Sequence, residues 1–178
     1  MKPHKINNGI PEMDFEIKVA WWPDKWIKKF FSKEKKMNKT LIEIALAEYG
    51  TKEISGSRHN MDIVNYAKNA GFAWVNDDET PWCSIFLSWA AMKANLSRSK
   101  KANARSWLSV GEETKTPETG DVAIMWRGNP NGWHGHVGIF INREKGIVRI
   151  LGGNQSNEVN ISEYPEEQIL GYRRLTKA

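Results

Sequence analysis

The sequence has very little cysteine, because Cys83 is the only one among 178 residues. A single cysteine excludes an internal disulfide framework and a zinc site built from several thiolates. The chain also has no apolar run that approaches the ~18–20 residues needed to span a bilayer. Its charged first five residues are not followed by the hydrophobic core of a signal peptide. We therefore expect a protein that is made in the cytoplasm without a signal peptide.

The overall composition is that of a globular protein with a basic balance. Hydrophobic residues make up 40% of the chain and charged residues 26%, and the net charge is +5. This charge suits nucleic acid, anionic lipid or bacterial wall polymer, but no groove-reading motif is visible, and we expect no nucleic acid to be bound. Nine tryptophans supply flat surfaces that can stack on sugars, although we expect core packing to account for more than half of them.

Residues 1–37 differ from the rest and are expected to form an N-terminal extension. Apolar and polar residues alternate over 13–21, which predicts a strand, and a basic amphipathic helix is predicted over 22–36. Its apolar aromatic face and its lysine face would allow contact with an anionic membrane. The alternative, which we favour, is that this helix packs on the main domain and leaves its lysines in water.

Residues 38–178 show the pattern of an α+β domain, in which helices come first and an antiparallel sheet follows. Helices are predicted from 38 or 40 to 50, over 60–70, from 80 to about 95, and over 102–110. Strands are predicted over 121–127, 136–142, 147–151, 159–161 and 168–173, separated by turns rich in Gly, Asn and Pro.

The surroundings of Cys83 predict the start of a helix. Thr80 is a good N-cap, Pro81 suits the first helical position, and an apolar run over 85–92 follows. The thiol then lies in the first turn, where free amide N–H groups and the helix dipole favour the thiolate. An inert buried cysteine is the alternative. Three acidic residues over 77–79 would raise the thiol pKa, so we expect them to face solvent or to hold a basic group.

A nucleophilic thiol needs a base within hydrogen-bond reach. His4 and His59 lie in an expected frayed terminus and a polar turn. His134 and His136 flank Gly135 at the head of a predicted strand, and His136 directly precedes its buried run. We therefore predict His136 as the base and His134 as a residue of the rim, while a structural core histidine remains the alternative for His136.

The base needs a third group that orients it, and the adjoining strand over 147–151 ends in residues able to do this. Asn154 leaves that strand after two glycines, and its amide can hold an imidazole tautomer without adding a charge. Gln155 and Glu158 are the fallbacks. Asn154 could also serve only the turn.

Five motifs now resemble a known family: Asp-Glu-Thr-Pro-Trp-Cys-Ser at 78–84, Ala-Arg-Ser-Trp-Leu at 104–108, Gly-Asp-Val at 120–122, Gly-His-Val-Gly at 135–138 and Leu-Gly-Gly-Asn-Gln at 151–155. Together, over about 39–174, they look like the endolysin-like peptidoglycan hydrolases of phages and bacteria, which belong with the CHAP-type and NlpC-type cysteine amidohydrolases. The resemblance implies a papain-like fold, no cofactor and no metal. It also implies cleavage of a peptidoglycan amide bond by Cys83 and His136.

The resemblance extends to the third position, with one departure. Asn154 matches the polar residue there, but many CHAP domains also carry a Glu two residues earlier, where this chain has Gly152. The implied reaction is attack by a Cys83 thiolate, paired with imidazolium, on a stem-peptide carbonyl. The resulting acyl-enzyme is then hydrolysed by water, with the Cys83 N–H as an oxyanion donor.

Several further residues are expected near the substrate, although ordinary packing is the alternative for each tryptophan: Trp82, Trp126, Trp133, His134 and Gln155. We expect a monomer whose partner is bacterial peptidoglycan, and which reaches the wall after release through a holin or as part of a virion if a phage encodes it.

Two other readings stay open. A non-catalytic module could bind wall or membrane through its tryptophans and basic helix, and a metal hydrolase could be built on His134 and His136, although no obvious third ligand completes that site. The sequence leaves open which amide bond is cut, and whether the protein is a lysis enzyme, a virion component or a secreted toxin.

Overall fold

The structure is a computed structural model that describes residues 39–178. The strand and the basic amphipathic helix predicted for the N-terminal extension lie outside the described residues. Within the described part, no helix is long and apolar enough to cross a membrane.

Among the described residues, the α-helices come first: α3 (Lys39–Ala47), α4 (Met61–Ala70) and α5 (Cys83–Lys93), followed by the short 3-10 helix η1 (Ala104–Ser109). The ends of α4 follow from local chemistry. The Asn60 side chain accepts a hydrogen bond from the Asp62 N–H, and Gly71 ends the helix with φ of 90°. The predicted helix over 60–70 is confirmed.

Helix α5 begins later than the sequence predicted. Its first residue is Cys83, and Trp82 occupies the N-cap position without a side-chain cap. Thr80, the predicted cap, lies in a preceding turn in which its N–H donates to Asp77 Oδ1 over 2.6 Å. The prediction of Thr80 as N-cap was therefore wrong, because the turn at Asp77 and the burial of Trp82 delay the helix by two residues. The cysteine nevertheless remains in the first turn.

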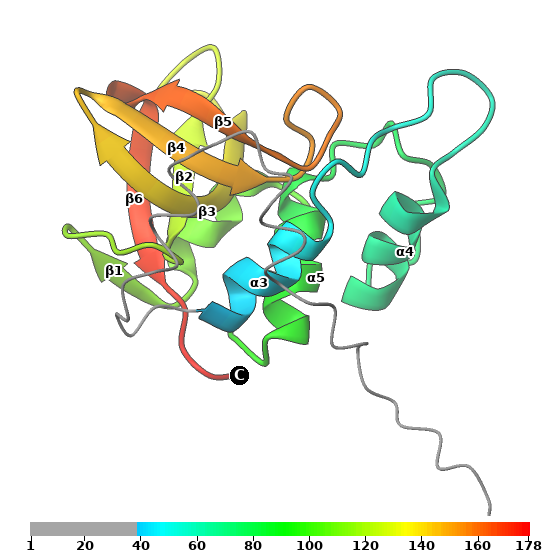
Figure 1. Ribbon diagram of the computed structural model, residues 1–178, viewed down its shortest axis with the longest axis horizontal. Coiled ribbons are helices and arrows are strands. Elements are labelled where there is room, and N and C mark those ends of the chain that lie inside the picture. Colours follow the sequence, from blue (N-terminus) through cyan, green and yellow to red (C-terminus); the bar gives the residue numbers. More distant parts are fainter. Residues whose placement is uncertain (1–38) are drawn as a thin grey trace, which may run out of the picture. The chain divides into compact units, whose positions relative to one another are not determined.

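Within residues 39–178, six antiparallel strands form one sheet with the order β1-β6-β2-β3-β4-β5. Its members are β1 (Glu112–Thr114), β2 (Val122–Trp126), β3 (Gly135–Glu144), β4 (Ile147–Gly152), β5 (Asn160–Pro165) and β6 (Ile169–Arg174), and η2 (Glu166–Gln168) links the last two. The short edge strand β1 was not predicted. All five strands predicted within 38–178 are present, with shifted ends, and the α+β class is confirmed (Figure 1).

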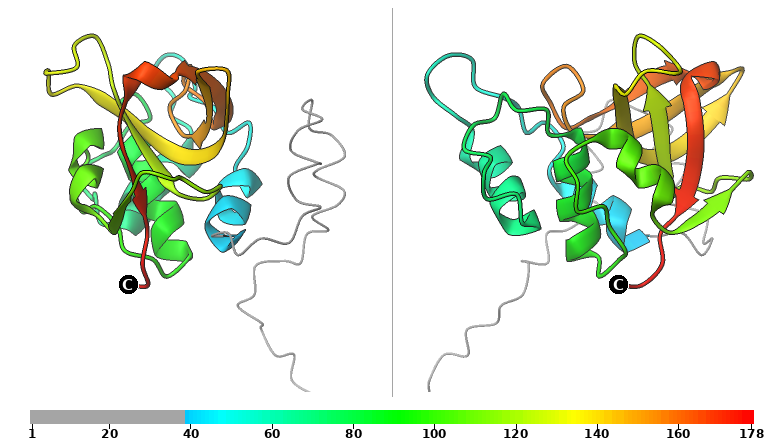
Figure 2. Two further views of the ribbon diagram at one scale, coloured as in Figure 1. Left: turned by 90° about the vertical axis from the view of Figure 1, so that its left-hand side faces the viewer. Right: turned by 180° about the vertical axis from the view of Figure 1, so that it is seen from behind.

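Helix α5 is the centre of the packing. Its first nine residues, 83–91, are all buried, as expected for a helix that is apolar all round. It contacts α3 and α4 on one side and β3 and β4 on the other, so it lies between the other helices and the sheet (Figure 2). The sequence therefore places its one thiol at the end of the most buried helix, beside the central strands.

Candidate active site

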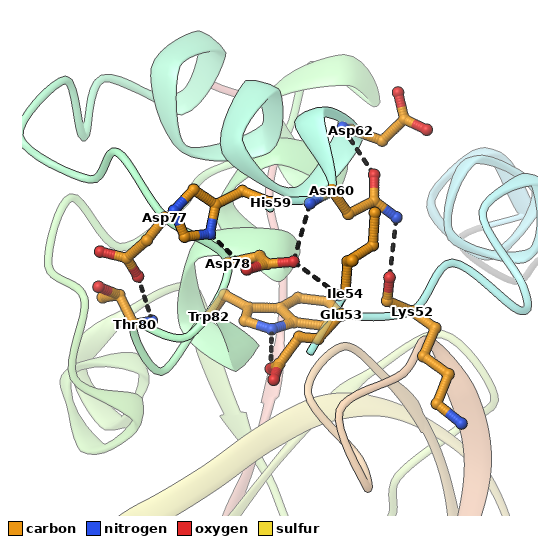
Figure 3. Close-up of polar contacts among 10 residues, drawn as sticks. All are labelled: Lys52, Glu53, Ile54, His59, Asn60, Asp62, Asp77, Asp78, Thr80 and Trp82. Carbon is orange, nitrogen blue, oxygen red and sulfur yellow. Dashed lines mark hydrogen bonds and ion pairs between the residues drawn. The ribbon is translucent and has the colours of Figure 1, made fainter. Parts of the chain in front are cut away.

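The segment that leads to the cysteine is anchored by Asp78, whose side chain is fully buried. Its Oδ2 accepts hydrogen bonds from the backbone N–H groups of Asn60 (2.8 Å) and Ile54 (2.9 Å), and its Oδ1 lies 3.0 Å from His59 Nδ1 (Figure 3). Burial by itself would raise the pKa of Asp78, but these donors lower it. This carboxylate thus ties the loop before α5 to the start of α4. The sequence led us to expect that the acidic residues over 77–79 face solvent or hold a basic group. Asp78 contacts the His59 side chain, and Glu79 is exposed.

Trp82 fixes the entrance of α5 itself. Its indole Nε1 donates to Glu53 Oε1 over 2.7 Å (Figure 3), and the side chain is 1% exposed. Gly153 lies directly against it, since a Cβ on this glycine would come within 2.7 Å of the Trp82 ring and 2.8 Å of Phe86 Cβ. The structure therefore gives Trp82 a packing role in place of the predicted contact with substrate. The close approach brings the loop after β4 onto the first turn of α5.

The Cys83 thiol is buried, with 7% of the residue exposed. Burial raises the pKa of this thiol, while the Arg127 guanidinium and hydrogen bonds from the backbone N–H groups of Ser84, Val137 and Cys83 itself oppose the rise. Burial therefore opposes the expected thiolate. The N–H groups at the start of the helix lower the pKa of the thiol, as predicted, but burial raises it by more.

His136 is the buried histidine of the site, with 1% of its surface exposed. It lies at the start of β3, one residue before Val137, whose N–H acts on the Cys83 sulfur. Burial lowers the pKa of His136 to about 3, helped by the nearby Arg127 charge and opposed by the hydrogen bond between its ring and Gln155. Its Nδ1 has no hydrogen-bond partner among the described residues. The imidazole is thus neutral near pH 7 and has one free ring nitrogen.

The partner of the imidazole is Gln155. Its Oε1 lies 3.1 Å from His136 Nε2. Asn154, predicted for this role, forms no hydrogen bond with His136 and begins the turn after β4 with φ of 58°. The structure therefore brings the first fallback residue, and not Asn154, to the His136 imidazole. Glu158, the second fallback, serves the same turn, since its carbonyl accepts the Gln155 N–H over 3.0 Å.

The remaining predicted residues lie around the start of β3 and the end of β2. His134 is exposed, as expected for a rim residue, and the Trp133 ring lies 4.2 Å from its ring, centroid to centroid. Trp133 is 71% exposed. Trp126 is half-buried and donates to the Glu167 carbonyl, while Gln155 is too buried for the predicted contact with substrate. Residues 39–178 contain no group of three or more His, Cys, Asp or Glu side chains that could hold a metal ion.

Two residues at the site were not predicted. Arg127, exposed at the end of β2, affects both Cys83 and His136 through its charge. Tyr164 on β5 places its ring 5.6 Å from the His136 ring, and its hydroxyl donates to Gln155 Oε1 over 3.0 Å. No local motif marks either residue. Only the pairing of Met125 with His136 across β2 and β3, which puts residue 127 beside the head of β3, could have indicated Arg127.

A helix that carries a cysteine at its N-terminus, packed on an antiparallel sheet that carries a histidine, is the arrangement of papain-like α+β proteins, and the predicted fold class is confirmed. Residues 75–154 match the family model of the CHAP domain, which confirms the family resemblance for this stretch of the chain.

The crystal structure of a protein similar to lipoprotein, of the NLP/P60 family, from Staphylococcus aureus subsp. aureus Mu50 is similar to this chain, with a TM-score of 0.48 and 16% identity. The match covers 82% of this chain and 43% of that one, so the chain spans less than half of that protein. No curated protein matches the chain.

Proposed function

We propose that this chain is a cysteine hydrolase that cleaves an amide bond in the stem peptide or cross-bridge of bacterial peptidoglycan. One observation carries the proposal. The His136 imidazole is buried and neutral, its Nε2 contacts Gln155 Oε1, and its Nδ1 has no hydrogen-bond partner among the described residues. His136 directly precedes Val137, whose N–H forms a hydrogen bond with the Cys83 sulfur. The CHAP match supplies the substrate class, because CHAP domains act on peptidoglycan.

The proposed reaction begins from a neutral pair. The Cys83 proton moves to His136 Nδ1 while the sulfur attacks the amide carbonyl carbon, so that a C–S bond forms and the carbonyl electrons move to its oxygen. The first-turn N–H groups of Cys83 and Ser84 have no partner within the helix and are the candidate donors to that oxyanion. Collapse breaks the C–N bond as His136 returns the proton to the leaving amine, and water then hydrolyses the thioester.

The test is cleavage of purified sacculi, with released fragments weighed by mass spectrometry. Cys83→Ala and His136→Ala are expected to abolish release while circular dichroism and the unfolding midpoint remain those of a folded protein. Full activity of a folded Cys83→Ala protein would overturn the proposal. It would favour instead the non-catalytic wall-binding module, which exposed Trp74 and Trp133 also suit.

A matched pair of variants tests which amide orients the base. Gln155→Ala is expected to lower the rate at least about tenfold, as loss of a group that holds a general base does. Asn154→Gly keeps the turn, because glycine readily adopts the positive φ found there, and is expected to cost much less. The opposite order would return the orienting role to Asn154.

The exposed pair Trp133 and His134 is proposed to contact the substrate near the head of β3. A flat ring that is 71% exposed and lies against an imidazole suits stacking on a sugar. Trp133→Ala is expected to weaken binding to sacculi in a pull-down assay without changing the intrinsic alkylation rate of Cys83. Unchanged binding would argue against this contact.

A further inference from the structure

The side chain of Gln155 is enclosed, and both of its ends have partners. Gln155 is 1% exposed. Its Nε2 lies 2.6 Å from the Asn160 carbonyl, 3.0 Å from Asn160 Oδ1 and 3.2 Å from the Ile150 carbonyl. Its Oε1 lies 3.1 Å from His136 Nε2 and 3.0 Å from the Tyr164 hydroxyl. Every polar contact of this amide is therefore accounted for.

These contacts decide which end of the amide faces the base. Backbone carbonyl oxygens only accept hydrogen bonds, so the end that meets two of them must be the NH₂ group. Asn160 is itself fixed, because its Nδ2 donates to the Gln155 carbonyl over 2.9 Å and its Oδ1 accepts from Ser162 Oγ over 2.8 Å. Rotating the Gln155 amide by 180° would set oxygen against oxygen. The acceptor end consequently points at His136 and Tyr164.

The orientation of the amide then determines the tautomer of the imidazole. Oε1 cannot donate, so the proton in its contact with His136 must sit on Nε2. A neutral imidazole carries one N–H, and Nδ1 is therefore bare. This agrees with the absence of any hydrogen-bond partner for Nδ1 among residues 39–178. Nδ1 is thus the ring nitrogen free to accept a proton from the thiol.

The Tyr164 hydroxyl is the second donor to the same oxygen. Tyr164 lies on the edge strand β5, and its ring is inclined by 30° to the His136 ring at a centroid distance of 5.6 Å. Burial raises the pKa of this phenol, while the charge of Arg127 and hydrogen bonding with its guanidinium oppose the rise. A guanidinium can only donate, so the phenol oxygen accepts from Arg127 and its own proton goes to Gln155.

We propose that Tyr164 is a positioning residue, which fixes the Gln155 carboxamide so that His136 keeps its proton on Nε2 and Nδ1 stays available for the Cys83 proton. The proposal rests on the hydrolase function proposed above. Tyr164 does not touch the reacting atoms; it acts through Gln155 and by packing beside the imidazole.

The test compares Tyr164→Phe with Tyr172→Phe. Both changes remove one hydroxyl from the same side of the sheet, but the Tyr172 hydroxyl is buried without any hydrogen-bond partner among the described residues. Tyr164→Phe is expected to lower kcat on soluble peptidoglycan fragments about 3- to 10-fold with KM unchanged, the effect of one net hydrogen bond. Tyr172→Phe is expected to keep the wild-type kcat. Equal rates in the two variants would overturn the proposal.

A second readout does not depend on cleavage. ¹⁵N NMR of the histidine-labelled full chain, with the His136 signals identified by their loss in His136→Gln, reports which ring nitrogen carries the proton. We expect protonated Nε2 and bare Nδ1 throughout pH 5–8, with a weaker Nε2–H hydrogen bond in Tyr164→Phe. A proton on Nδ1 in the unmodified protein would refute the inference. If the unmodified protein shows the predicted tautomer but no cleavage that depends on Cys83, the proposed function alone is refuted.

Discussion

Replacing Asp78 tests whether this one carboxylate holds the segment that carries the nucleophile. In Asp78→Ala the backbone N–H groups of Ile54 and Asn60 lose their acceptor, and so does the side chain of His59. An unsatisfied buried donor costs about 1–3 kcal/mol. Because these two bonds are only partly buried, we take the lower half of that range and expect a loss of about 2–4 kcal/mol in the free energy of unfolding. That is a large share of the ~5–15 kcal/mol typical of a domain.

The matched control is Asp78→Asn. Its amide keeps one oxygen for both N–H groups and can turn its NH₂ toward His59 Nδ1, which accepts when the ring is neutral. We expect a loss of no more than about 1.5 kcal/mol, since the geometry survives and only the charge is removed. Urea denaturation followed by tryptophan fluorescence measures both values. With a slope of roughly 2 kcal/mol per molar, the middle of the usual range in urea, the midpoint should fall by about 1–2 M in the alanine variant.

The contribution of Asp78 to the free energy of unfolding should also depend on pH. The pKa of Asp78 is lower in the folded state, so its contribution to stability is present above the unfolded pKa of about 3.9 and is lost as pH falls through the folded pKa. The difference between the wild type and Asp78→Asn should therefore narrow below about pH 4. The reasoning is refuted if Asp78→Ala costs less than about 1 kcal/mol, or if the asparagine variant is as unstable as the alanine variant.

Two further predictions concern the contacts around the thiol. Gly153→Ala should lower the free energy of unfolding by about 1–3 kcal/mol through overpacking, because the new Cβ would come within 2.7 Å of the Trp82 ring and 2.8 Å of Phe86 Cβ. Gly171→Ala, whose nearest neighbour is the flexible end of Leu108 at 3.3 Å, is the control, and equal effects in calorimetry would contradict the explanation. Because burial raises the pKa of Cys83, alkylation by iodoacetamide at pH 7.5 should be slower than that of a free cysteine, and its rate should level off at a higher pH than the rate of a free cysteine does. A plateau of fast alkylation between pH 5 and 8 would instead indicate a resting thiolate–imidazolium pair.

Short-range chemistry was sufficient for much of the fold. The helix over 60–70 is closed by its own neighbours, Asn60 and Gly71, so a reading of adjacent residues finds both ends. The same method gives the wrong start for α5. Thr80 and Pro81 form a good local signal, but Trp82 is held by Glu53, which lies 29 residues away, and this distant contact decides where the helix begins. The strand β1 has only three residues and exists through its pairing with β6.

Local sequence patterns likewise found some residues of the candidate site and missed others. Alternation and the apolar run after Gly135 were enough to predict that His136, among the four histidines, is held at the head of a buried strand, because a strand that enters the core fixes its first side chain. Adjacent amides at 154 and 155 cannot be ranked by such a pattern. Positive φ values at 154, 156 and 157 shape the turn, and contacts with Asn160 and Ile150 turn Gln155 inward.

The sequence alone thus determined that the thiol stands in the first turn of an apolar helix, and that a histidine opens the strand beside it, because capping and periodicity are properties of neighbouring residues. Only the tertiary structure decided how deeply the two side chains are buried, at 7% exposed for Cys83 and 1% for His136. This burial opposes a charge on either group, because the free energy of removing water from an ion exceeds what one helix end and a few N–H groups return.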